Sequence, residues 1–113
     1  MTLPTVSVIV VSRHRPKALL RCLTSLAQQD HPRIEVIVVA DPAAADQVDA
    51  PVKLHRFDEA NISAARNAGL RLAAGEVVAF IDDDAVADPT WASRLAAAFH
   101  DAPVVAATGF VRG

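Results

Sequence analysis

Short apolar runs alternate along the chain with longer segments in which Ala and Leu recur at helical spacing. The apolar runs are rich in Val and Ile, as in strands of a parallel sheet that is covered on both faces. They predict five strands, at Val6–Val11, Ile34–Ala40, Val52–Phe57, Glu76–Ile81 and Val104–Thr108. Such alternation is typical of β-α-β units, so we expect one α/β domain over residues 1–113, with three layers (α/β/α) and a mostly parallel, Rossmann-like sheet.

The segments between the strands carry helix start and stop signals. They predict helices that begin at Pro16, run from Ile62 to Ala74, and run from Pro89 to about His100, with a short helix possible after Asp41-Pro42. Asn61 is expected to cap the second helix and Gly75 to follow its end, while Asp88 is expected to cap the last. The chain stops soon after the fifth strand, so we expect it to be part of a longer protein.

Composition places few further limits on function. Hydrophobic residues make up 52% of the 113 residues, enough for a core without disulfides, and the net charge of −2 favours neither nucleic acid nor an anionic membrane surface. The single cysteine, Cys22, suits a reducing cytoplasm. No apolar stretch approaches the roughly 20 residues of a membrane span. We therefore expect a soluble cytoplasmic protein, peripheral at the inner face of a membrane at most.

Polar side chains follow three of the predicted strands. Ser12 follows the first, Asp41 the second, and the triplet Asp82-Asp83-Asp84 the fourth. Ligands of open parallel sheets bind beyond the carboxyl ends of strands, where the strand order reverses. If the fourth strand returns to the far side of the first, Ser12 and the triplet face each other across that crevice. Asp41 would then border the crevice from a strand end, outside the core.

Three adjacent carboxylates repel one another unless a cation neutralises them. Mg2+ or Mn2+, which prefer hard oxygen ligands, are the expected cofactors. In extended backbone Asp82 and Asp84 point to one side and Asp83 to the other. A solvated acidic turn is the alternative, and the uninterrupted apolar strand before the triplet favours the metal site.

A resemblance to a known family emerges from residues 61–85, NISAARNAGLRLAAGEVVAFIDDDA. This stretch resembles the core of the family 2 glycosyltransferases of GT-A fold, in which an Ala-Arg-Asn-x-Gly helix, Gly-Glu, an apolar strand and an acidic DxD-type motif follow one another. The first two predicted strands also match the family's, in the right order. The resemblance implies the N-terminal, nucleotide-sugar-binding part of an enzyme that transfers sugar from a nucleoside-diphosphate donor to an unknown acceptor with inversion.

The resemblance also implies roles for single residues. Asp84, supported by Asp82, would hold the metal that bridges the donor diphosphate, and Asp82 and Asp83 would contact the ribose. Asp41 would hydrogen-bond the base, and Ser12 would line the base and ribose pocket. Arg66 would reach the nucleotide from its helix. The catalytic base would lie in the later half of the family's proteins, beyond residue 113.

This chain departs from the family after its first strand, where Val11-Ser12-Arg13-His14 replaces a usual Pro-Thr-Tyr-Asn. The aromatic ring that often lies near the base is missing at that position. The basic segment from Arg13 to Lys17 occupies a predicted helix N-terminus, where the dipole disfavours cations. We predict a solvated basic turn, with a bound anion or a nearby acid as the alternatives.

Two other functions remain open. A nucleotidyltransferase could use a similar sheet, although it would typically carry a glycine-rich loop with Lys or Arg after the first strand. A non-catalytic module could keep the nucleotide-binding fold without transferring sugar.

Overall fold

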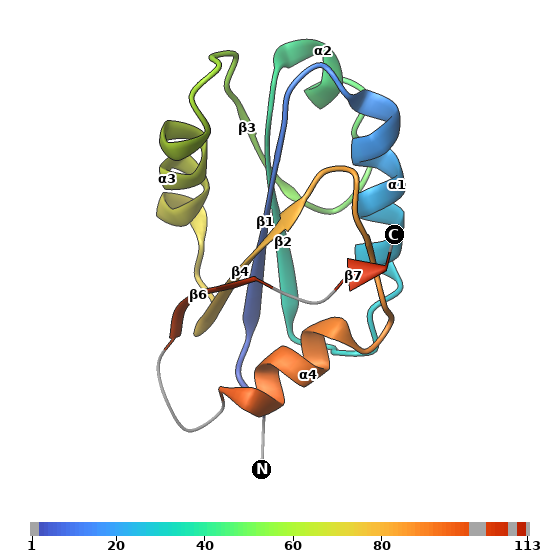
Figure 1. Cartoon of the computed structure of the whole chain (residues 1–113), viewed down its shortest axis with the longest axis vertical. Helices are drawn as coiled ribbons and strands as arrows, with labels where there is room; N and C mark the ends of the chain where they lie inside the picture. The colour runs from blue at the N-terminus through green and yellow to red at the C-terminus, as the bar shows by residue number, and fades with distance from the viewer. Residues whose placement is uncertain (1–2, 100–103, 109–110, 113) are drawn as a thin grey trace.

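The computed structural model describes residues 3–99, 104–108 and 111–112, and its centre is a five-stranded sheet (Figure 1). Every neighbouring pair in this sheet is parallel, which confirms the prediction. The strand order is β3-β2-β1-β4-β6. The strands are β1 (Val6–Ser12), β2 (Ile34–Ala40), β3 (Lys53–Arg56), β4 (Val77–Asp82) and β6 (Val104–Thr108).

Helices cover both faces of the sheet, so the predicted three layers are present (Figure 1). One face carries α1 (Pro16–Ala27), α2 (Pro42–Ala45) and α4 (Trp91–Ala98), and the other carries α3 (Ile62–Leu72).

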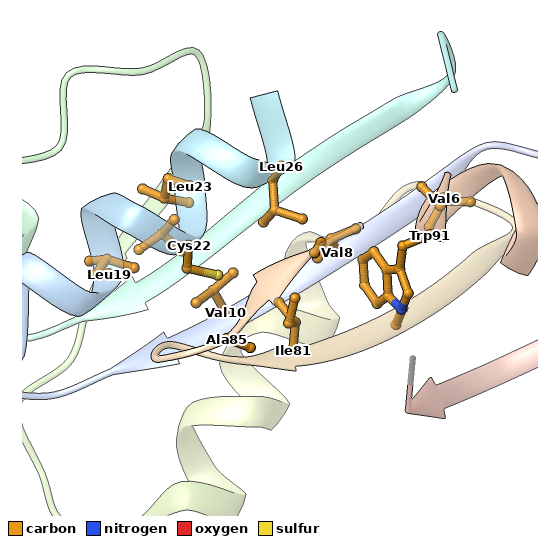
Figure 2. Close-up of a cluster of buried hydrophobic side chains, with 14 of the residues drawn as sticks. Val6, Val8, Val10, Leu19, Cys22, Leu23, Leu26, Ile81, Ala85 and Trp91 are labelled. Carbon is orange, nitrogen blue, oxygen red and sulfur yellow. The ribbon is translucent and has the colours of Figure 1, made fainter. Parts of the chain in front are cut away.

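The side chains of β1 alternate between two hydrophobic cores. Val8 and Val10 pack with α1 and with Trp91, as Figure 2 shows, whereas Ile9 packs on the opposite face with Ala65 of α3. Burial on both faces explains why the strand is apolar almost throughout.

The start of the last helix differs from the prediction because a side chain forms a local turn. The last helix begins at Trp91 and not at Pro89, since Asp88 Oδ1 accepts hydrogen bonds from the Thr90 N–H (3.0 Å) and hydroxyl (2.8 Å). The predicted end of that helix at His100 lies outside the described residues. Sequence periodicity also missed β5 (Val86–Ala87) and β7 (Val111–Arg112), which pair antiparallel with each other.

Gly75 has a different role from the expected helix terminator. The helix α3 ends at Leu72, and Gly75 does not adopt a left-handed backbone. A Cβ atom at Gly75 would lie 2.6 Å from Ser7 Oγ and 2.9 Å from the Thr5 carbonyl oxygen. Glycine is therefore needed here for the close approach of the chain to β1.

Candidate functional site at the carboxyl ends of β1 and β4

The strand order reverses between β1 and β4, which lie side by side although they are separated along the chain. Their ends are level, with Val11 paired to Asp82. Ser12 Oγ donates a buried hydrogen bond of 2.8 Å to Asp83 Oδ2. The predicted meeting of Ser12 and the triplet at one sheet edge is confirmed, at the place where such sheets bind ligands.

The three acids of the triplet lie in different environments. Asp83 is buried, whereas Asp82 and Asp84 are exposed. The expected extended backbone ends at Asp82, the last residue of β4. Asp83 and Asp84 lie in a turn that is closed by a hydrogen bond of 3.0 Å from the Ala85 N–H to the Asp82 carbonyl oxygen. The carboxylates of Asp82 and Asp84 are thus exposed to solvent, while that of Asp83 is hydrogen-bonded to Ser12.

The basic segment is exposed to solvent, as predicted, but several of its side chains also lie close to acids. Arg13 Nε lies 3.1 Å from Asp58 Oδ1, and His14 Nδ1 lies 3.6 Å from Asp41 Oδ2. Arg15 reaches the triplet itself, as described below. Nearby acids, one of the two alternatives, explain why the guanidinium groups of Arg13 and Arg15 are tolerated at a helix N-terminus.

Asp41 is a core residue, contrary to the expectation that it lies outside the core. It is 2% exposed, because its carboxylate turns inward and caps α2. Oδ1 accepts from the His14 N–H at 2.8 Å and Oδ2 from the Ala44 N–H at 3.3 Å. The His14 N–H bond lowers the pKa of Asp41, and with the Ala44 bond it outweighs the desolvation that raises this pKa. Asp41 also anchors His14, whose φ of 60° is left-handed.

A cavity of about 250 Å³ opens beside Ser12, between the ends of β1 and β2 and the start of α3. Among the described residues its walls include Val11, Val39, Phe57 and Ala65. Phe57 was not singled out from the sequence, although it directly follows the third strand at the same sheet edge. It supplies an aromatic ring in a region where the segment after β1 has none.

Arg66 of α3 lies near Asp82, on the face of the sheet that α3 covers. Its guanidinium lies 5.4 Å from the centre of the Phe80 ring, within cation–π range. Arg66 and Asp82 line a second, small cavity of about 20 Å³. Of the predicted site residues, Ser12 joins the larger cavity, Arg66 and Asp82 share the smaller one, and Asp41 is not among the described residues that line either.

The carboxylates project a negative potential into the protein. Cys22 Sγ lies 3.6 Å from the Asp82 carbonyl oxygen. Burial, followed by the charges of Asp83, Asp84 and Asp82, raises the pKa of the Cys22 thiol from 9.0 to about 12. The site therefore favours a cation at its open side.

The residues present suit a divalent cation that shares its shell with a ligand. Within the described part of the chain, no three His, Cys, Asp or Glu side chains cluster closely enough to hold a metal by themselves. Mg2+ in nucleotide sites is usually held by one or two carboxylates together with substrate phosphates. Asp82 and Asp84 are exposed and fit that requirement.

The model of the family described as "Glycosyl transferase family 2" matches residues 7–113. The chain belongs to glycosyltransferase family 2. It is 34% identical over 115 residues to a glucosyl-dolichyl phosphate glucuronosyltransferase of Haloferax volcanii, covering 92% of this chain and 37% of that protein. The family assignment rests on this match and not on the acidic triplet alone.

Solved structures of glycosyltransferases share the fold of this family 2 chain. S. aureus TarS in complex with UDP is 32% identical, with a TM-score of 0.69, over 86% of this chain and 32% of that one. A mannosyltransferase from Pyrobaculum calidifontis in complex with GDP-Man and Mn2+ is 26% identical, with a TM-score of 0.68, over 87% and 32%. These neighbours confirm the GT-A fold.

The chain spans about a third of the length of the curated relatives it matches. Over the residues that the structure describes, no helix combines the length and the apolar character needed to cross a membrane.

Proposed function

We propose that this chain forms the donor-binding part of an inverting glycosyltransferase that takes a nucleoside-diphosphate sugar with Mg2+ or Mn2+. The observation that carries the proposal is the Ser12–Asp83 hydrogen bond at the strand reversal, with two exposed carboxylates beside it. Membership of family 2 and structural neighbours in complex with UDP or GDP-Man support the same proposal. A cytoplasmic location belongs to this proposal, supported by the buried, unpaired Cys22 thiol.

The nucleoside is proposed to occupy the cavity beside Ser12. The cavity is large enough for part of a nucleoside, and Phe57 offers its ring to a base while Val11 and Val39 offer apolar contact. Ser12 would contact the ribose. Asp41 is also proposed to accept from the base, through the lone-pair sites that the hydrogen bonds from His14 and Ala44 leave unused. Because this carboxylate is buried and does not line the cavity, that contact would require the base to reach past the cavity wall.

The diphosphate is proposed to lie at the triplet, at the end of β4, whereas the nucleoside would lie at the ends of β1 and β2. Asp84, assisted by Asp82, would hold the metal, and Asp83 would support the ribose side through Ser12. A bound divalent cation would neutralise charge on the leaving nucleoside diphosphate. Arg66, whose cavity Asp82 shares, would reach the nucleotide from α3. The carboxylate that deprotonates the acceptor is proposed to lie outside these 113 residues.

The proposal is tested by calorimetric titration of UDP and GDP into the chain, with and without Mn2+. Because protein carboxylates and the diphosphate would share one metal shell, each ligand should strengthen binding of the other by the same factor. Asp84→Ala should abolish this coupling, since it removes an exposed metal ligand without disturbing the core. Asp49→Ala, which removes another exposed carboxylate, is the matched control and should leave the coupling unchanged.

Nucleotide affinity that is the same with and without Mn2+ would contradict the role of the triplet. Coupling that persists in Asp84→Ala would contradict the assignment of Asp84. A transfer assay with nucleotide sugars completes the test, because sugar transfer by the 113-residue chain would contradict a catalytic base elsewhere.

A further inference from the structure

Arg15 connects the segment after β1 to the acidic triplet on β4. Its Nη1 lies 3.3 Å from Asp83 Oδ1 and its Nη2 lies 3.1 Å from Asp84 Oδ2. One guanidinium therefore bridges two carboxylates in very different environments, because the Asp83 side chain is 8% exposed and that of Asp84 is 57% exposed. The forked shape of the group suits this bridging, which a lysine ammonium cannot reproduce.

The position of Arg15 is unfavourable apart from these contacts. It stands at the N-cap of α1, and its side chain makes no capping hydrogen bond. The positive end of a helix dipole repels a cation. The attraction of the triplet is therefore what holds the guanidinium there, and the same attraction is what a divalent cation would use.

We propose that Arg15 is the resident counter-cation of the triplet and determines when a divalent cation can bind there. The inference rests on the proposed function, because it concerns the same carboxylates. Without a donor, the guanidinium covers Asp84 Oδ2, so a metal ion that binds alone must displace Arg15 from that oxygen. The displaced guanidinium then lies close to the positive charge of the metal ion, which is unfavourable. When a diphosphate arrives with the metal, the displaced guanidinium gains an anionic partner in exchange.

The consequence is selectivity for metal and diphosphate together over metal alone. Displacement from Asp84 is feasible because both groups are about half exposed, and exposed ion pairs are weak. The contact with buried Asp83 can persist meanwhile and keep Arg15 at the edge of the site.

The test measures Mn2+ binding in the absence of nucleotide, by the electron paramagnetic resonance signal of free Mn2+. Arg15→Gln should tighten Mn2+ binding about three- to tenfold, the effect of losing one exposed ion pair and one positive charge a few ångströms from the metal. Lys17→Gln removes the same charge from an exposed position in the first turn of α1 and should change the affinity less than about twofold. Arg15→Lys should fall between the parent and Arg15→Gln.

The second arm repeats the titration with UDP or GDP present. The factor by which nucleotide strengthens Mn2+ binding should be smaller in Arg15→Gln than in the parent, because the metal-free site no longer carries its own cation. Thermal unfolding of each variant confirms that the fold is retained, as expected for a side chain that is 53% exposed.

Several outcomes overturn the inference. One is Arg15→Gln binding Mn2+ no more tightly than the parent, including the case in which neither binds detectably. Another is an equal gain in Mn2+ affinity in Lys17→Gln, which would show that only the net charge of the protein matters. Failure of the proposed function looks different: UDP and GDP would not bind the parent even with Mn2+, while the metal-only comparison would still decide the role of Arg15.

Discussion

Replacing Asp41 by alanine tests whether this acid organises the site or only borders it. The side chain is 2% exposed and accepts from the backbone N–H groups of His14 and Ala44. Asp41→Ala leaves both N–H donors without this acceptor, and each buried donor without a partner costs about 1–3 kcal/mol. The substitution also removes a helix N-cap worth about 0.5–2 kcal/mol. These effects overlap at Ala44, so we expect a loss of about 2–4 kcal/mol in the free energy of unfolding.

That loss is large for a chain of this size. Domains are stable by roughly 0.05–0.15 kcal/mol per residue, which gives about 6–17 kcal/mol for 113 residues. At this size 1 kcal/mol moves the melting temperature by about 4 °C, so Asp41→Ala should melt about 8–16 °C below the parent. Urea unfolding followed by circular dichroism measures the free energy, and differential scanning calorimetry measures the melting temperature.

The matched control is Asp46→Ala, which removes a nearby carboxylate that is 67% exposed and paired with Arg56 at 2.8 Å. An exposed pair contributes about 0–1 kcal/mol, so this variant should remain close to the parent. Asp41→Asn keeps one acceptor oxygen and should fall between parent and Asp41→Ala. Equal stability of Asp41→Ala and Asp46→Ala would refute the structural role of Asp41.

The pH dependence of this difference follows from the lowered pKa of Asp41. A carboxyl whose folded pKa lies below its unfolded value of 3.8 stabilises the fold above that value and loses its contribution as pH falls through the folded pKa. The deficit of Asp41→Ala should therefore be complete at neutral pH and shrink below about pH 4. A deficit that instead grew in acid would contradict the assigned ionisation state.

Two further predictions concern Phe57 and Glu35. Phe57→Ala should weaken UDP or GDP binding about three- to tenfold, because it removes an aromatic contact of about 0.5–1.5 kcal/mol. Leu70→Ala is the control, since Leu70 is not among the residues that line the cavity, and it should leave the affinity unchanged. Calorimetry measures both, and equal affinities of the two variants would show that the nucleoside binds elsewhere. For Glu35, desolvation raises the pKa, but hydrogen bonds from Lys53, Ser7 and the Ala74 N–H outweigh it and lower the pKa from 4.5 to about 2. Glu35→Gln should therefore cost about 1–2 kcal/mol at pH 7 after allowance for solvent screening. That cost should vanish between about pH 4.5 and 2 in urea unfolding, and a pH-independent deficit would contradict the ionic network.

The sequence alone determined the parallel sheet and the edge at which the site lies. The Val- and Ile-rich runs of β1, β2 and β4 are apolar because both faces of the sheet are covered, and this pattern is local and readable. Parallel strands place all their carboxyl ends at one edge, so Ser12 and the triplet had to lie there once the order of strands was assumed. The Ala-Arg-Asn-x-Gly segment at 65–69 and the acids after β4 were enough to suggest the family.

Only the tertiary structure decided which charges and surfaces meet at that edge. Arg15 pairs with acids about 70 positions later, and Phe57 reaches the cavity beside Ser12 from another strand. Asp41 turned out to be buried because the loop at His14 folds over it. Local periodicity records which face of an element is covered, but it carries no information on side chains that are brought together across strands, since such contacts depend on strand order and loop path.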